Sequence, residues 1–136
     1  MKKTEQKITT EIKKYLQHFN KYGSCAIEVK QTPTRLLNYK SNIKDRWHQL
    51  VALQIVKHKR LLYKISDIDA MTAKPFDLFC LEGVPAFYMI SFQYPKNKTV
   101  YMIDVDVMET EILLGNKKSL SIERAKEIAF DKIQIK

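Results

Sequence analysis

The chain has few of the residues that mark fibrous, crosslinked or membrane-spanning proteins. Its 136 residues include only 3 glycines and 4 prolines, too few for a collagen-like or linker-rich chain. No apolar run reaches the roughly 18–20 residues that a membrane-spanning helix requires. The lysine-rich N-terminus has no apolar stretch behind it, so we expect no signal peptide, no membrane partner and a cytoplasmic, intracellular location.

Cysteine is equally scarce. Cys25 and Cys80 are the 2 cysteines of the chain, and they do not form a C-x-x-C motif. Neither a disulfide framework nor a zinc site with one of the 3 histidines is therefore indicated. Both cysteines are expected to be free thiols.

What is present indicates one folded domain over residues 1–136. Hydrophobic residues make up 45% of the chain and charged residues 29%, which is typical of a globular protein. The formal net charge is +9, from 24 basic and 15 acidic residues. A field of this sign favours a polyanionic partner such as nucleic acid. The alternative is a lysine-rich surface that serves only solubility, because most of the basic residues are lysines.

The apolar pattern predicts alternating helices and strands. Helical spacing is found over residues 4–19, 43–58 and 121–131. Strand-like patterns are found over residues 26–30, 61–65, 75–81, 86–92 and 99–108, with loops over 31–42 and 66–74. We therefore expect an α/β or α+β domain in which a mixed central β-sheet is flanked by helices.

One short motif can carry chemistry. Glu28 and Lys30 are two apart on a predicted strand, so their side chains share a face. The carboxylate can hold Mg²⁺, which prefers oxygen ligands, and the ammonium can stabilise negative charge on a phosphate. Acid-x-Lys also occurs at Glu5 and Glu11, but on a predicted helix. Without further support, a surface ion pair is the simpler interpretation.

The surroundings of this motif resemble a known superfamily. The segment CAIEVKQT at residues 25–32, a polar loop and the helical segment IKDRWHQL at residues 43–50 are similar to the PD-(D/E)XK nucleases. The similarity is greatest to their Holliday-junction resolvases of the RecU and Hjc types. It implies a restriction-endonuclease-like fold, a Mg²⁺ or Mn²⁺ cofactor and a symmetric homodimer. It also implies catalytic roles for Glu28, Lys30 and Gln49, and a metal ligand at Glu11.

The chain departs from the family pattern at the second acidic ligand. The family places an aspartate on a strand before the acid-x-Lys strand, but residues 12–27 contain no aspartate. Asp77, in the sequence KPFD, is the best substitute as catalytic residue and metal ligand, although it lies downstream. In another alignment Asp77 begins the regular motif, and the partner strand 86–91 then has no acid and no lysine, as in a non-cutting relative. Asp67 and Asp69 are reserve ligands.

Further residues complete the prediction. His48 is a candidate general base, and Asp104 with Asp106 can chelate a metal if both lie on one strand face; surface positions are the simpler interpretation of all three. Basic side chains near the motif would contact DNA phosphates without reading sequence. These DNA-binding candidates are Arg35, Lys40, Lys44, Lys57, Lys59 and Arg60. The apolar segment at residues 112–114 is a candidate dimer interface.

The hypothesis that follows is a metal-dependent, structure-selective DNA endonuclease. Its substrate would be branched DNA, and its activity would resolve Holliday junctions in recombination and repair. The alternative is a catalytically degenerate protein that keeps the nuclease fold for nucleic-acid binding. A third hypothesis is a protein-interaction subunit whose charge reflects lysine usage alone.

Overall fold

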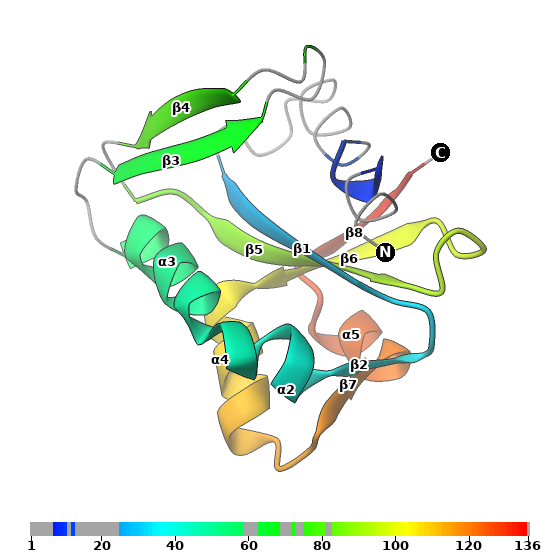
Figure 1. Ribbon diagram of the computed structural model, residues 1–136. Coiled ribbons are helices and arrows are strands. Elements are labelled where there is room, and N and C mark those ends of the chain that lie inside the picture. The colour runs from blue at the N-terminus through cyan, green and yellow to red at the C-terminus, as the bar shows by residue number, and fades with distance from the viewer. Residues whose placement is uncertain are drawn as a thin grey trace.

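The computed structural model describes residues 7–10, 12, 25–58, 63–68, 72, 75–80 and 83–135. Residues 7–10 and 12 are helical, which agrees with the helix predicted there. The elements that follow are shown in Figure 1. They are β1 (Ala26–Thr32), β2 (Leu36–Asn38), α2 (Tyr39–Asn42), η1 (Lys44–Arg46), α3 (Trp47–His58), β3 (Tyr63–Ile68), β4 (Pro75–Cys80), β5 (Ala86–Phe92), β6 (Thr99–Asp104), α4 (Val105–Leu114), β7 (Ser119–Ser121), α5 (Ile122–Ile128) and β8 (Asp131–Gln134).

A four-stranded mixed sheet forms the centre of the molecule, with the strand order β1-β5-β6-β8. β1 and β5 are parallel, whereas β5 with β6 and β6 with β8 are antiparallel. A parallel pair needs a crossover connection, and α3 lies within it. The expected α+β domain, with a mixed central sheet and flanking helices, is therefore confirmed.

Two further pairs of strands lie outside this sheet. β2 pairs with β7, and β3 pairs with β4, in both cases antiparallel. In Figure 1 the β3–β4 hairpin lies above α3, whereas the β2–β7 pair lies near α2 and α5. The hairpin belongs to the chain between α3 and β5, so it is an insertion in the crossover.

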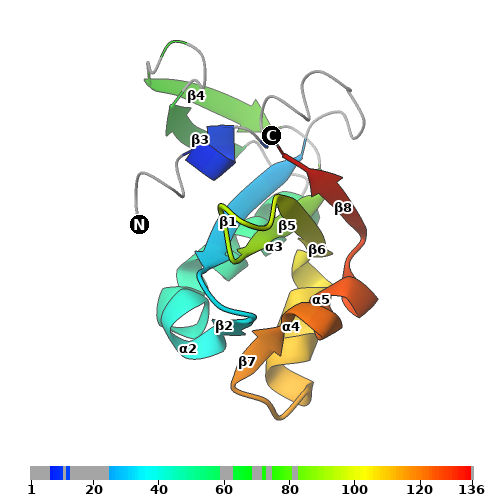
Figure 2. The ribbon, with the colours of Figure 1, turned by 90° about the vertical axis from the view of Figure 1, so that its right-hand side faces the viewer.

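Both faces of the central sheet are buried. In Figure 2, α2, α4 and α5 lie on one side of the sheet, and the helical segment at residues 7–10 lies on the other. Side chains of β5 alternate between two cores: Tyr88 and Ile90 pack on the side of α3 and α4, whereas Phe87 and Met89 pack with Ile8. All seven residues of β5 are buried, as expected of a central strand covered on both faces.

The strand predicted over 99–108 is wrong beyond residue 104. Asp104 ends β6, and its side chain accepts hydrogen bonds from the backbone N–H groups of Asp106 (2.9 Å) and Val107 (3.3 Å). This N-cap starts α4, because it satisfies amide groups that have no partner inside the helix. Asp104 and Asp106 are thus not two side chains of one strand face.

The loop predicted over residues 31–42 is also partly wrong. β1 continues to Thr32, whose hydroxyl donates to the carbonyl oxygen of Leu36 at 2.9 Å. Asn38 ends β2 and caps α2 by accepting a hydrogen bond from the backbone N–H of Ser41 at 3.0 Å. The helix predicted from residue 43 begins as the short 3-10 helix η1 before α3.

Other boundaries differ more modestly. β3 runs from residue 63 to 68, so it takes in part of the loop predicted over 66–74. Ser121 caps α5 as expected, since its hydroxyl accepts from the backbone N–H of Arg124 at 3.0 Å. α5 ends at Ile128 instead of continuing to residue 131, and β8 follows. Within the described residues, no helix has the length and hydropathy needed to cross a membrane.

Candidate functional site

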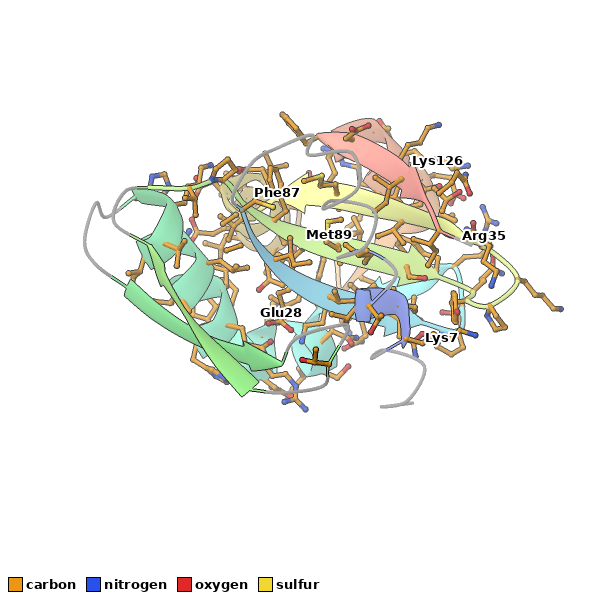
Figure 3. All side chains as sticks on the ribbon, turned by 90° about the horizontal axis from the view of Figure 1, so that it is seen from above. Lys7, Glu28, Arg35, Phe87, Met89 and Lys126 are labelled. Carbon is orange, nitrogen blue, oxygen red and sulfur yellow. The ribbon has the colours of Figure 1, made fainter. Side chains whose placement is uncertain are left out.

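The acid-x-Lys motif lies on β1 and faces the helical layer that contains α3. Alternation along the strand places Glu28 and Lys30 on the side of Ala26, which packs with α3 and α4 residues in one core. Val29 between them packs in the core on the opposite face. Figure 3 shows Glu28 on the side of β1 where α3 and the β3–β4 hairpin are found. The motif therefore faces other elements of the fold, and its Lys30 side chain is buried.

Three residues predicted to act together do meet. The Lys30 ammonium donates a hydrogen bond to Oε1 of Gln49, on the first turns of α3, at 2.8 Å. The same nitrogen lies 3.9 Å from Oε2 of Glu28. The Lys30 side chain is 8% exposed and that of Glu28 is 30% exposed, and both take part in further interactions. The carboxylate is thus the more accessible of the two charged groups.

Tyr88 belongs to this site, although sequence reasoning did not include it. It lies opposite Glu28 in the parallel register of β1 and β5, and its side chain is fully buried. Burial raises the pKa of Tyr88, and the negative charge of Glu28 raises it further. The hydroxyl has no hydrogen-bond partner among the described residues. The strand 86–92 was predicted, but nothing in its sequence indicates that β1 is its neighbour.

The predicted acidic ligands lie largely outside the described residues. Glu11 and Asp69 are not described, and of Asp77 and Asp67 only the backbone is. Asp77 lies on β4 opposite Ser66 of β3, and Asp67 lies opposite Phe76. β4 is therefore hydrogen-bonded to β3. Among the residues whose side chains are described, no three histidines, cysteines, aspartates or glutamates come together as metal ligands.

The candidate DNA-binding residues differ in their pairing. Arg35 forms an ion pair with Glu123, and Lys40 contacts Asp45 at 3.1 Å. Lys44 is exposed and forms no ion pair with any other described residue. Arg46, which was not predicted to bind DNA, is likewise exposed and unpaired within that part of the chain. Lys59 and Arg60 lie outside the described residues.

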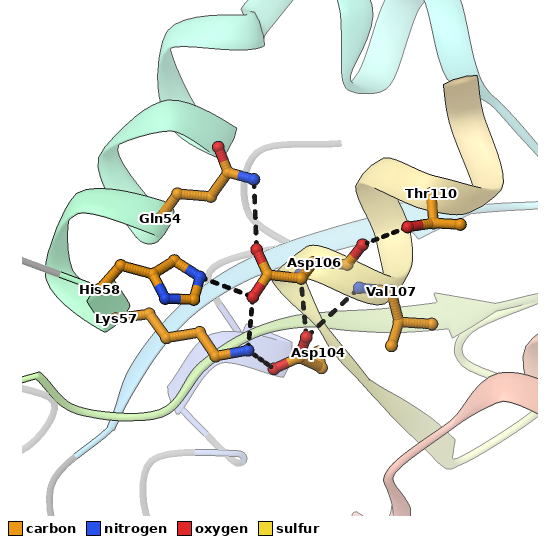
Figure 4. Close-up of polar contacts among 7 residues, drawn as sticks. All are labelled: Gln54, Lys57, His58, Asp104, Asp106, Val107 and Thr110. Atoms are coloured by element: carbon orange, nitrogen blue, oxygen red, sulfur yellow. Dashed lines mark hydrogen bonds and ion pairs between the residues drawn. The ribbon is translucent and has the colours of Figure 1, made fainter. Parts of the chain in front are cut away.

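Lys57 belongs to a second polar cluster, drawn in Figure 4. Its ammonium lies 2.6 Å from both Asp104 and Asp106, and Asp106 also contacts Nε2 of His58 at 2.7 Å and the amide of Gln54 at 3.3 Å. Burial lowers the pKa of Lys57, but the two aspartates outweigh it and raise that pKa overall. The cluster ties the end of α3 to the start of α4.

The pKa of Asp106 is lowered, whereas that of Lys57 is raised. Burial alone would raise the pKa of its carboxyl group, but hydrogen bonds and charge from Lys57 and His58 hold that pKa below its ordinary value. The sequence analysis pairs Asp104 with Asp106, but on one strand face, and it does not predict their contacts with Lys57 and His58. His48, the candidate general base, is exposed on α3.

Comparison of the chain with models of known families, with curated proteins and with solved structures gives no match.

Proposed function

We propose that the protein is a metal-dependent, structure-selective DNA endonuclease with a restriction-endonuclease-like fold. One observation carries the proposal: Lys30 and Glu28 share a face of β1, with the ammonium buried against Gln49 and the carboxylate partly exposed. The sequence resemblance, which spans residues 25–32 and 43–50, implies catalytic roles for the same three residues. Branched DNA, such as a Holliday junction, is the substrate that the resemblance implies.

The accessible group of the site fits a hard cation. Mg²⁺ commonly takes one or two protein carboxylates and completes its coordination with water and substrate phosphates. Glu28 would hold it, with Asp77 and Glu11 as the further ligands that the sequence indicates. The bound ion would neutralise phosphate charge and make a coordinated water more acidic.

Lys30 would stabilise charge on the phosphate instead of binding the metal. Its ammonium is fixed by Gln49 at 2.8 Å, so it needs little reorganisation to stabilise negative charge that develops on a phosphate. Gln49 therefore acts as a positioning residue that sets the direction of the lysine side chain. A fixed cation in a largely buried setting stabilises charge more strongly than a solvated one.

DNA binding and dimerisation belong to the same proposal. Lys44, exposed near the start of α3, would contact phosphates, and the net charge of +9 would attract DNA over a distance. Paired cuts in a four-way junction require two active sites, hence a homodimer. The exposed side chains of Leu113 (62%) and Leu114 (79%) offer apolar surface for such a contact.

A cleavage assay tests the function. Labelled four-way junction, flap and plain duplex are incubated with the protein and Mg²⁺ or Mn²⁺, beside Glu28→Gln and the control Glu127→Gln, which alters an exposed acid on α5. We expect cuts in the branched DNA that Glu28→Gln loses and Glu127→Gln keeps. A protein that binds the junction but never cuts it with either metal is instead a degenerate nuclease fold kept for binding.

A further inference from the structure

We propose that Tyr88 is a positioning residue for Glu28, and that its buried hydroxyl donates a hydrogen bond to the Glu28 carboxylate when this carboxylate holds the cation. This inference rests on the proposed function, because it takes Glu28 to be a metal ligand. It adds a residue that the acid-x-Lys motif does not contain and that lies on another strand, 60 positions along the chain.

The register of the central sheet carries the geometric argument. Tyr88 of β5 and Glu28 of β1 are Cα partners in a parallel pair. Neighbours at the same register position project to the same side of a sheet, so both side chains enter the layer that contains α3. The Glu28 side chain is 30% exposed, whereas Tyr88 is fully buried. Of these two neighbouring side chains, only that of Glu28 reaches solvent.

The buried hydroxyl of Tyr88 lacks, among the described residues, the hydrogen bond that such a group normally makes. A fully buried polar group is normally hydrogen-bonded, but Tyr88 Oη has no partner within the described part of the chain. A phenylalanine would fill the same volume without a polar atom. A hydrogen-bond donor at this place fits a carboxylate acceptor that needs orientation. Carboxylates that bind metals are themselves commonly hydrogen-bonded, and these partners fix the orientation of the ligand.

Ser91 provides a natural control on the same strand. Its hydroxyl is also fully buried and without a partner among the described residues. Three positions along β5 from Tyr88, it projects to the opposite face of the sheet, away from Glu28. Ser91→Ala and Tyr88→Phe therefore remove the same kind of group from one strand, but only the second removes it from the Glu28 side.

The test measures Mn²⁺ binding by titration calorimetry and is independent of DNA cleavage. The wild-type protein is compared with Glu28→Gln, Tyr88→Phe and Ser91→Ala. We expect Glu28→Gln to abolish binding and Tyr88→Phe to weaken it about 10–100-fold, the usual effect of removing a hydrogen-bond partner of a metal ligand. Ser91→Ala is expected to keep the wild-type affinity.

A second measurement separates positioning from a structural role. Without metal, Tyr88→Phe should unfold at the same temperature as the wild type or at a higher one, since no hydrogen bond is lost. A lower melting temperature would mean that the hydroxyl already has a structural partner, and it would overturn the inference.

The remaining outcomes distinguish the inference from the proposed function. Unchanged Mn²⁺ affinity in Tyr88→Phe, with binding lost in Glu28→Gln, overturns the role of Tyr88 but leaves the nuclease proposal intact. An equal loss in Ser91→Ala also overturns it, because the effect would then be one of strand packing. If the expected binding pattern holds but no DNA is cut, the nuclease proposal fails while the role of Tyr88 stands. No metal binding by the wild type overturns both.

Discussion

Two lysines join α3 to the rest of the molecule, and their surroundings differ. Lys30 projects from β1 toward α3, where it meets a neutral amide at 2.8 Å and has a carboxylate at 3.9 Å. Lys57 projects from α3 toward the end of β6, where it meets two carboxylates at 2.6 Å. The Lys30 side chain is 8% exposed and that of Lys57 is 26% exposed. The more deeply buried of the two lysine side chains thus lies farther from the carboxylate of Glu28 than Lys57 lies from its two aspartates.

The difference distinguishes a structural cation from a candidate functional one. The Lys57 contacts are short and charge-assisted, and they join two helices, so they are expected to stabilise the fold. Burying an ammonium as deeply as that of Lys30 carries a large desolvation cost. Proteins accept local costs of this kind most often at functional sites. Substitutions of the two lysines are therefore expected to affect different properties of the protein.

The largest expected effect is on catalysis. Replacing Lys30 with methionine keeps the apolar stem but removes the charge, and we expect single-turnover cleavage of branched DNA to fall by at least about 100-fold. Lys57→Met, the matched control, should retain most of the activity. Equal losses in the two variants would remove the functional distinction between these lysines.

The second effect is on stability, and here Lys57→Met is expected to cause a larger loss than Lys30→Met. Lys57→Met leaves Asp104 and Asp106 without their shared cation, and we expect it to lower the free energy of unfolding by about 1–2 kcal/mol. This is less than the loss for a fully buried pair, because all three groups are partly exposed. Urea unfolding of both methionine variants measures it. A larger loss in Lys30→Met would show that Lys30 is the main structural cation.

The third prediction concerns acid. The folded-state pKa of Asp106 is lowered from its ordinary value of 3.8, with Lys57 and His58 outweighing the effect of burial. A lowered pKa means that the ionised carboxylate stabilises the fold fully above about pH 4, and that this contribution is lost as the pH falls through the folded value. Asp106→Asn should therefore be less stable at pH 7, with a smaller further loss between pH 4 and pH 2. Unfolding free energies measured over this range test it, and parallel curves for the two proteins would contradict it.

The smallest effect is on DNA binding. Lys44 is exposed and unpaired among the described residues, whereas Lys40 is paired with Asp45. Lys44→Ala should reduce the slope of log affinity against log salt concentration by about one, the value for one lost phosphate contact. Lys40→Ala should change it less, and Lys126→Ala on α5 should leave it unchanged. Equal changes in all three variants would indicate a diffuse field without a defined DNA path.

The sequence predicted those features that depend on neighbouring residues. The apolar segment at residues 86–92 predicts β5 with its observed bounds, and Ser121 is predicted and found as the cap of α5. Gln49 was expected on a helix after the acid-x-Lys strand, and it does contact Lys30. Periodicity and capping are local, so they can be seen without knowledge of the fold.

The missed features depend on contacts between distant segments. Residues 36–38 are too few to show a strand pattern, and they form β2 only because residues 119–121 lie beside them. Asp104 looked like part of an alternating strand, but its side chain turns back to cap α4. Nothing in the sequence of residues 86–92 distinguishes Tyr88, because what distinguishes it is its register position opposite Glu28 on another strand. The register between two separate strands cannot be predicted from the sequence of either strand alone.

One contact beside α3 has a consequence for how this chain can change over time. The backbone N–H of Val84 donates to the carbonyl oxygen of Val56 at 3.2 Å, and a Cβ on Gly83 would lie 2.4 Å from the carbonyl oxygen of Lys57. The two ends of the segment that contains the β3–β4 hairpin therefore lie next to each other at the end of α3. Segments whose ends meet can be shortened, lengthened or exchanged at little cost in closure entropy. A change in the length of this segment is thus expected to leave β1 and β5 in register, whereas replacement of the whole hairpin would also remove Asp77, a proposed metal ligand.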